Sequence, residues 1–308
     1  MSSNNFVPYQ NNGMNDTAWT KKPVSEGFTD SVSNAINNTN FFADTFNVAT
    51  GRKIKLNDSV EITFPPFACS NFNDNTAITN GTIKVEVLLL KRKGDFIKYL
   101  IPTTSKSNLL ESGGSFFVRI SKNGQELSML PNAYFKLRWN DAAPKTDMKF
   151  FTGIPLMNHD SLFTWMPATN GYVTLWDSTG MGVAKKGYDI TSGTTHWINS
   201  DFFIDTLTGT RTRLNVTLPL NNTNKNTMVF AVLKNKRTIV RLSADYQTRS
   251  FYSLNIPVNS VVTLLTISMI ENNFYVDSRD VTVLNADRFA LFPVKKSITE
   301  INTILDNL

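Results

Sequence analysis

Residues 112–130, SGGSFFVRISKNGQELSML, alternate apolar and polar side chains on both sides of an Asn-Gly pair. Asn-Gly favours a two-residue type I′ turn, because both central positions of that turn need positive φ. The pattern predicts an antiparallel hairpin centred on Asn123-Gly124, with one apolar face that covers a core. The predicted apolar pairs are Ile120–Leu127 and Val118–Met129, and the predicted polar pairs are Arg119–Ser128 and Ser121–Glu126.

Similar apolar runs follow one another from Gly51 onward, separated by Asn, Asp, Gly, Ser and Pro. They amount to about sixteen predicted strands at the short spacing that sandwiches and barrels use. No long helical period interrupts them, which argues against a parallel α/β fold. The runs include TIKVEVLLL, DFIKYLIP, AYFKLRW, GYVTLW, RLNVTLPL, TMVFAVLK and SVVTLLTISMI. The predicted fold class is all-β, with two successive jelly-roll or β-sandwich units.

The strand pattern lapses around residues 140–170, which are rich in Pro and Asn. This lapse predicts the division between two units of similar size, a first sandwich over residues 49–155 and a second over residues 156–308. Residues 1–48 are polar and rich in Asn, so we expect an N-terminal arm with one short helix. The weak helical spacing in this arm falls on Val32, Ala35, Ile36 and Phe42.

A second helix is predicted at the C-terminal end. Ser297 and Glu300 have the spacing of a capping box, in which each side chain bonds the backbone amide of the other residue. The residues that follow form one apolar stripe, made of Ile298, Ile301, Ile304, Leu305 and Leu308. Such a stripe needs an apolar surface to cover it, and either its own domain or a neighbouring subunit can provide one.

Composition and charge indicate a folded chain and limit the kinds of partner that it can bind. With 308 residues, 41% hydrophobic side chains and 22 Phe, the chain can bury a sizeable core and is not disordered. The net charge of +6 carries no basic tail or acidic block, so we predict no specific nucleic-acid partner. We interpret the cluster Lys91-Arg92-Lys93 as a solvated loop, with binding of an anionic partner as the alternative. No secretory signal or membrane-spanning run is present, so we expect synthesis in the cytoplasm.

Side chains able to perform chemistry are few. Cys69 is the single cysteine, which excludes a cysteine-based metal site and favours a small buried residue. The two histidines, His159 and His196, lie in different segments. Asp160 is adjacent to His159, but no second His or Cys lies nearby to build a zinc site. We interpret His196 as a half-buried structural residue. We predict no catalytic residue and no metal site.

Three short segments contain residues that occur in binding motifs. Gly180-Met181-Gly182 lacks the third glycine of a dinucleotide-binding motif, so we predict no cofactor. The segments 70–81 and 277–280 are rich in oxygen ligands, but tight turns explain them better than calcium loops.

The tryptophans offer one alternative function. Trp139, Trp165 and Trp176 surround the predicted boundary, where aromatic rings can form a stacking surface for a sugar. Packing in a core or an interface is the other use of such residues.

The chain resembles β-domains of surface proteins of Bacteroidota over most of its β region. The segments that carry this resemblance are NGTIKVEVLLLKRKGDFIKYLIPTTSKSNLLESGGSFFVRISKNGQEL, DMKFFTG, HWINSDFF and RLNVTLPLNNTNKNTMVFAVL. The resemblance implies a bacterial surface adhesin or a carbohydrate-binding β-sandwich protein.

Two successive all-β units with flanking arms and no export signal also resemble the double jelly-roll major capsid proteins of icosahedral phages. These include phages with an internal membrane that infect flavobacteria. This second resemblance implies a structural virion protein that assembles as a homotrimer and contacts other virion proteins. In phages with an internal membrane, that membrane would be a further partner. We expect the protein in the virion, after synthesis in the host cytoplasm.

Overall fold

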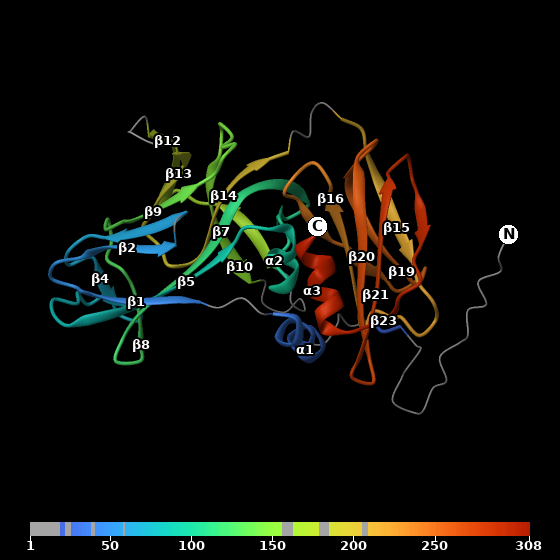
Figure 1. Ribbon diagram of the computed structural model, residues 1–308, viewed down its shortest axis with the longest axis horizontal. Coiled ribbons are helices and arrows are strands. Elements are labelled where there is room, and N and C mark those ends of the chain that lie inside the picture. Colours follow the sequence, from blue (N-terminus) through green and yellow to red (C-terminus); the bar gives the residue numbers. More distant parts are fainter. Residues whose placement is uncertain are drawn as a thin grey trace.

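The computed structural model describes residues 19–21, 26–37, 41–57, 59–155, 163–178, 185–204 and 209–308. Within these residues the chain is all-β, and its four sheets form two β-sandwiches that lie side by side with helices between them (Figure 1). The predicted fold class and the predicted C-terminal helix are confirmed. None of the helices in the described segments has the length and apolar content needed to cross a lipid bilayer.

The first sandwich is made of strands β1 to β14. Its larger sheet has the strand order β1-β5-β7-β14-β10-β11, and β4, β6 and β8 extend it; its smaller sheet has the order β12-β13-β9-β3-β2. The larger sheet contains β1 (Phe42–Asn47), β4 (Cys69–Asn71), β5 (Thr82–Leu90), β6 (Thr104–Ser105), β7 (Asn108–Lys122), β8 (Gln125–Met129), β10 (Lys149–Pro155), β11 (Phe163–Pro167) and β14 (His196–Phe203). The smaller sheet contains β2 (Arg52–Asn57), β3 (Val60–Phe64), β9 (Phe135–Asn140), β12 (Gly171–Ser178) and β13 (Lys185–Ser192).

The second sandwich is made of strands β15 to β23. One sheet has the order β18-β19-β15-β22, in which β22 runs parallel to β15, and the other has the order β17-β16-β20-β21-β23. The first contains β15 (Arg211–Thr217), β18 (Ser243–Asp245), β19 (Ser250–Pro257) and β22 (Arg288–Ala290). The second contains β16 (Thr227–Leu233), β17 (Ile239–Arg241), β20 (Val261–Ile270), β21 (Asn273–Thr282) and β23 (Val294–Lys296).

Strand β16 shows why some strands have no polar face. All seven of its residues are buried, because one sheet face covers the core of the second sandwich and the other faces the first sandwich. Val229, Ala231 and Leu233 point into the sandwich core, whereas Met228, Phe230 and Val232 belong to a separate apolar core. A strand that is buried on both faces has a continuous apolar sequence instead of an alternating one.

We call this separate apolar core between the two sandwiches the joint. Its buried residues include Leu88, Leu90, Leu110, Phe151 and Trp165 from the first sandwich, Met228, Phe230, Val232, Leu265 and Ile267 from the second, and Phe28, Val32, Ile36, Phe96, Ile97, Ile301 and Leu305 from the helices. The joint fills the space between the two sheets that face each other, so the sandwiches share buried surface along their common side.

Three helices contribute to the joint: α1 (Glu26–Ile36), α2 (Lys93–Lys98) and α3 (Ile298–Asp306) (Figure 1). Helix α1 places Phe28, Val32 and Ile36, which are four residues apart, on one buried face. The Ser33 hydroxyl of α1 donates a hydrogen bond to the carbonyl of Lys98 at the end of α2. Helix α1, which precedes the first strand, is therefore part of the folded body, and its order comes from contact with the joint.

Helix α3 docks within its own chain. The predicted capping box is present: the Ser297 hydroxyl accepts from the Glu300 amide at 3.2 Å, and the Glu300 carboxylate accepts from the Ser297 amide at 2.8 Å. Ile301 and Leu305 are buried in the joint, and the ammonium of Lys98 on α2 donates to Asp306 on α3 at 3.0 Å. Of the two surfaces considered for the apolar stripe, the structure provides the one from the same chain.

The predicted domain boundary at residues 155 and 156 does not coincide with the division between the sandwiches. Strands β13 and β14 follow that boundary in the sequence but pair with β9 and β7 of the first sandwich. The first sandwich therefore extends to Phe203, and the second begins at Arg211. Likewise, β1 pairs with β5, so the predicted arm over residues 1–48 already contains a strand of the first sandwich.

The predicted hairpin is confirmed at its turn. Asn123 and Gly124 have φ values of 53° and 80°, and Ile120 lies opposite Leu127 on the buried face. Beyond this pair β8 separates from β7 and pairs with β4, so Met129 lies opposite Cys69 and not opposite Val118. The predicted pairs Val118–Met129 and Arg119–Ser128 are therefore wrong.

The run DFIKYLIP was predicted as a strand, but its first half forms α2. The Asp95 carboxylate accepts hydrogen bonds from the backbone amides of Lys91 and Arg92 at 3.1 and 2.8 Å, which stabilises the start of the helix. Phe96 and Ile97 are buried in the joint. A short apolar run has too few residues to separate the period of a helix from that of a strand.

Candidate functional site

Within the described segments no group of three or more His, Cys, Asp and Glu side chains is placed to hold a metal ion. Cys69 lies buried in the core of the first sandwich, where desolvation raises the pKa of its thiol to about 11. His159 and the segment Gly180-Met181-Gly182 lie outside the described residues.

His196 opens β14 at the edge of a polar surface. Its imidazole contacts the Glu126 carboxylate through Nε2 and stacks on the ring of Phe117, with ring centroids 5.5 Å apart. The side chain is 40% exposed, as expected for a half-buried residue. Its backbone has a φ of 70°, and the paired neighbours on β7 hold it in this left-handed conformation.

The three tryptophans do not form a surface for stacking a sugar. Trp139 and Trp165 have no exposed area, because Trp139 lies in the core of the first sandwich and Trp165 lies in the joint. Trp176 is half-buried, and the guanidinium of Arg138 lies 4.6 Å above its ring. The alternative of a stacking surface made by these residues is therefore not supported, and packing, the other interpretation, is the role that the burial of Trp139 and Trp165 shows.

The two oxygen-rich segments differ from each other. Asp74 lies in a turn, where its carboxylate accepts a hydrogen bond from the Thr76 amide, and this bond lowers the pKa of the carboxyl. Residues 277–280 belong to strand β21 and not to a turn. Asp277 accepts from the Phe292 amide at 2.7 Å, and Asp280 accepts from the Thr263 hydroxyl at 2.6 Å.

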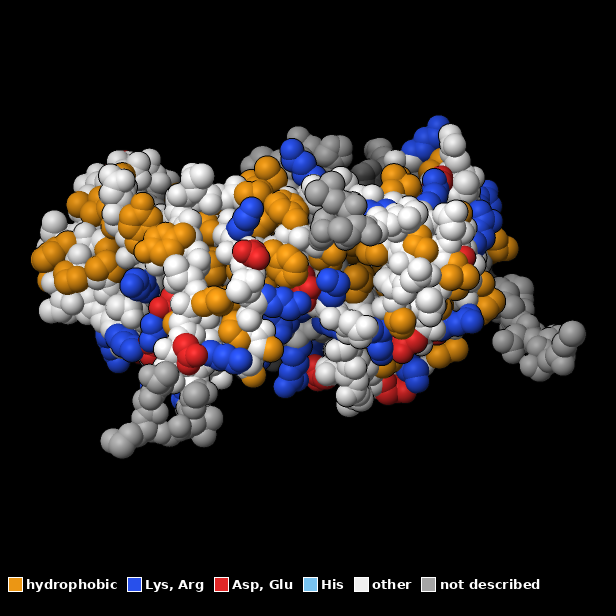
Figure 2. All heavy atoms as spheres, turned by 90° about the horizontal axis from the view of Figure 1, so that it is seen from above, with side chains coloured by type: hydrophobic (Ala, Val, Ile, Leu, Met, Phe, Trp, Pro, Cys, Tyr) orange, Lys and Arg blue, Asp and Glu red, His pale blue; other side chains and the backbone are white. Residues whose placement is uncertain are grey.

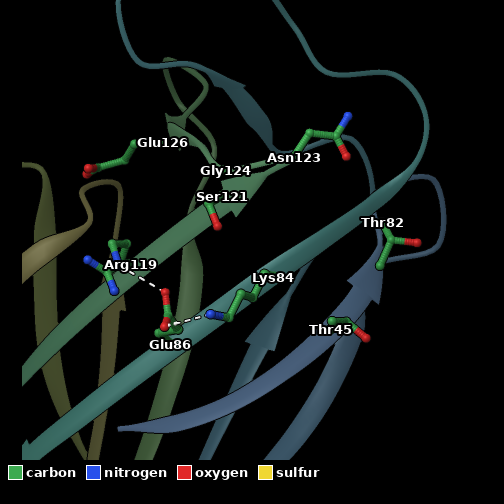
Figure 3. Close-up of a pocket in the computed structure, with 9 residues that line it drawn as sticks. All are labelled: Thr45, Thr82, Lys84, Glu86, Arg119, Ser121, Asn123, Gly124 and Glu126. Atoms are coloured by element: carbon green, nitrogen blue, oxygen red, sulfur yellow. Dashed lines mark hydrogen bonds and ion pairs between the residues drawn. The ribbon is translucent and has the colours of Figure 1, made fainter.

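A polar groove crosses the outer face of the larger sheet of the first sandwich (Figure 3). The groove has a volume of about 540 Å³ and lies over β1, β5, β7 and the predicted hairpin. We call it the outer groove, and its lining residues are Thr45, Thr82, Lys84, Glu86, Arg119, Ser121, Asn123, Gly124 and Glu126.

Glu86 lies at the centre of the charges in the outer groove. Lys84 donates to one carboxylate oxygen at 2.8 Å and Arg119 donates to the other at 3.0 Å, as the dashed lines in Figure 3 mark. The hydrogen bonds from Lys84 and from Arg119 lower the pKa of Glu86 below its usual range. Glu86 therefore stays ionised at neutral pH, and Lys84 and Arg119 line the groove on either side of it.

Aromatic rings flank one side of the outer groove. Phe41 is 41% exposed, and the guanidinium of Arg119 lies 5.9 Å from its ring centroid. Phe117 contacts Phe41 on one side and His196 on the other, and Phe72, which is 52% exposed, lies 5.9 Å from His196. Charged hydrogen-bonding groups next to exposed ring faces match the chemistry of a sugar, which has both hydroxyl groups and apolar C–H faces.

Exposed apolar side chains form a second kind of functional surface. On the face shown in Figure 2, hydrophobic side chains gather at the end of the molecule that the first sandwich forms, with further groups toward the middle. The most exposed large apolar residues are Phe67, Phe72, Tyr172, Leu220, Leu254, Leu284, Phe292 and Val294. Clusters of exposed apolar side chains mark surfaces that contact other proteins or membranes.

No match to a protein-family model, to a curated protein or to a solved structure is found for this chain.

Proposed function

We propose that the protein is a structural building block of an icosahedral shell, a major capsid protein that assembles as a homotrimer. The observation that carries this proposal is the joint. It converts two β-sandwiches into one body. One sheet of each sandwich and all three helices of the described segments bury apolar side chains together in it. A shell subunit must transmit force between neighbours without a hinge, and a large apolar interface prevents independent movement of two domains.

The exposed apolar side chains support the same proposal. Leu284, Phe292 and Val294 are each more than half exposed. Leu284 precedes β22, Phe292 lies between β22 and β23, and Val294 begins β23; both strands are edge strands of the second sandwich. Interfaces between subunits bury such side chains at their centres. In a virion, the partners of these surfaces are further copies of the chain, other virion proteins and the lipid membrane beneath the shell. A double jelly-roll arrangement of the two sandwiches is part of this proposal.

The oligomeric state of the purified chain tests the proposal. Light scattering after size-exclusion chromatography should give a species of about 104 kDa, three times the 34.6 kDa mass of the chain, and electron microscopy should show shells at higher concentration. The double substitution Phe292→Ser and Val294→Ser should lower the fraction of trimer. It leaves the joint, which includes Phe96, unchanged, so the fold of each subunit should be kept. Monomers of the unaltered protein at every concentration would refute the proposal.

Removal of residues 1–18, the first part of the predicted N-terminal arm, provides a second test. Trp19 packs on Phe251 with ring centroids 5.1 Å apart, and Thr20 exchanges two backbone hydrogen bonds with the Asn224 side chain. A deletion of residues 1–18 keeps these contacts, so thermal stability should not change. If the arm contacts neighbouring subunits, the deletion should impair shell formation; normal shells from the truncated chain would contradict that role.

Carbohydrate binding at the outer groove is the second candidate, as in a bacterial surface adhesin. It is favoured by the exposed Phe41 ring beside the cation pair that holds Glu86. A glycan array with the unaltered protein and with Phe41→Ala should show binding that the substitution removes. Lys55→Ala, which changes an exposed residue on the opposite sheet, is the matched control.

A further inference from the structure

A cleft with an excess of positive charge lies between the two sandwiches, beside α2. It has a volume of about 350 Å³, the space of about a dozen water molecules at roughly 30 Å³ each. Its walls come from β7, from the loop after β9, from β13 and from the turn between β16 and β17. Five cationic side chains line this cleft, which we call the basic cleft: Lys93, Lys145, Lys234, Lys236 and Arg237.

Two carboxylates line the basic cleft against these five cations. Glu111 is only 6% exposed and already contacts both Lys145 and Lys236, the second at 3.4 Å. Asp141 lies 3.9 Å from Arg237. The lining side chains therefore carry a net charge of +3, and Asp280 outside the cleft, 2.9 Å from Lys234, reduces it to +2.

Lys93 shows the electrostatic consequence of this excess. Its ammonium donates a hydrogen bond to the carbonyl of Lys234 at 2.7 Å, and no ion pair of Lys93 is present among the described residues. The pKa of Lys93 is lowered first by desolvation, and then by the positive charges of Lys234 and Arg237, against which Asp280 acts in the opposite direction. Folding thus holds like charges together, and an anion between them would relieve this repulsion.

One buried acid lies behind the cleft. Asp201 is fully buried on β14, and its Oδ1 has no hydrogen-bond partner within the described part of the chain. Desolvation raises its pKa well above the usual range, although the hydrogen bond from Ser112 and the charge of Arg237 oppose this shift. The shift disfavours the ionised form, so Asp201 opposes the positive charge of the cleft less than an exposed aspartate would.

The cleft also offers a neutral hydrogen-bond donor. The Tyr188 hydroxyl accepts from the Lys145 amide at 2.6 Å, and this contact leaves the hydroxyl proton available to donate. Several cations and a phenol around a small volume are the groups that recognise a compact oxyanion.

We propose that the basic cleft binds a multiply charged oxyanion of the phosphate class, with Lys93, Lys236 and Arg237 as its principal partners. Lys145 comes from the first sandwich, while Lys234, Lys236 and Arg237 come from the second. An anion bound among them contacts both sandwiches and stabilises their association next to the joint. Free pyrophosphate and the phosphate headgroup of a lipid both have this chemistry.

The test uses the full-length chain and pyrophosphate as the probe, at constant ionic strength set with chloride. Titration calorimetry should show saturable binding, and the melting temperature should rise with pyrophosphate. Lys93→Gln combined with Lys236→Gln should weaken the Kd at least about tenfold, since each removes a charged hydrogen bond. Lys136→Gln combined with Lys185→Gln removes the same charge from exposed positions outside the cleft, and binding should not change.

Co-sedimentation of the protein with phosphatidylcholine vesicles, with and without phosphatidic acid, tests whether the bound phosphate group belongs to a lipid or to a free anion. Binding to phosphatidic acid vesicles that is lost in the cleft variant assigns the headgroup, and binding to pyrophosphate alone assigns the free anion. The proposal is overturned if pyrophosphate and phosphatidic acid both fail to bind. It is also overturned if the cleft variant and the control variant bind equally well.

Discussion

The joint makes a quantitative prediction for α3. Ile301 is 1% exposed and lies in the joint, so Ile301→Ala removes three buried carbon atoms. At about 0.8 kcal/mol for each buried carbon, the transfer free energy alone is about 2.4 kcal/mol. The cavity left behind adds to this value, so we expect a loss of about 3 kcal/mol, within the range of roughly 2–5 kcal/mol for such substitutions.

Ile298→Ala is the matched control because it makes the same chemical change on the same helix. Ile298 is 41% exposed, and alanine favours the helix by a few tenths of a kcal/mol, so we expect a change below about 0.5 kcal/mol. The difference between the two variants measures docking of α3 on the joint and excludes a general effect on helix formation.

The assay can follow each core separately, since each has one buried tryptophan. Trp139 lies in the core of the first sandwich, Trp165 in the joint and Trp19 in the core of the second sandwich. With 5-fluorotryptophan incorporated, fluorine NMR gives one signal for each of the five tryptophans, and single Trp→Phe variants assign these signals. During urea unfolding of the unaltered protein, the signals of Trp19, Trp139 and Trp165 should change together. Equal stability of the Ile301 and Ile298 variants, or loss of the Trp165 signal well before the other two, would refute the role given to the joint.

Three further predictions concern single residues. Gly94→Ala should destabilise the protein by roughly 1–3 kcal/mol, measured by urea unfolding, because its added Cβ would lie 2.2 Å from the carbonyl oxygen of Leu305. Hydrogen bonds from Ser297 and Lys296 lower the pKa of Glu300 from 4.5 to about 2. Since the folded value is the lower one, the ionised cap stabilises the fold above about pH 4.5, and this contribution is lost as pH falls toward 2. The stability difference between the unaltered chain and Glu300→Gln should therefore be constant at neutral pH and vanish near pH 2. His196→Ala should lower stability by less than about 1 kcal/mol and leave assembly unchanged, and a metal ion bound at this side chain would contradict that expectation.

The sequence correctly predicted those structural features that depend only on residues adjacent in the chain. The Asn123-Gly124 turn and the Ser297–Glu300 capping box each depend on a few adjacent residues, and both are present. The division between the sandwiches depends on pairing between distant strands. The lapse of pattern around residues 140–170 includes the loop from β9 to β10, which are consecutive strands in the two sheets of the same sandwich, so it marks no boundary.

The candidate sites were beyond the reach of sequence patterns for the same reason. The outer groove combines Lys84 and Glu86 on β5 with Arg119 on β7, and the basic cleft combines Lys93 with residues more than a hundred positions later. One signal was present for the cleft: Lys93 belongs to the cluster Lys91-Arg92-Lys93, for which an anionic partner was the alternative to a solvated loop. The partners of that cluster become visible only when the β16–β17 turn is brought beside it by folding.

The position of α3 in the sequence has a consequence for biosynthesis. Residues 298–306 leave the ribosome after every strand of both sandwiches, so the strands can pair while the joint still lacks one helix. During this interval Phe96 and Ile97 on α2 stay partly uncovered, and a chaperone or a second nascent chain can contact them. Arrival of α3 closes that surface. The two sandwiches therefore gain their complete rigid connection only after α3 has been synthesised and has docked on the joint.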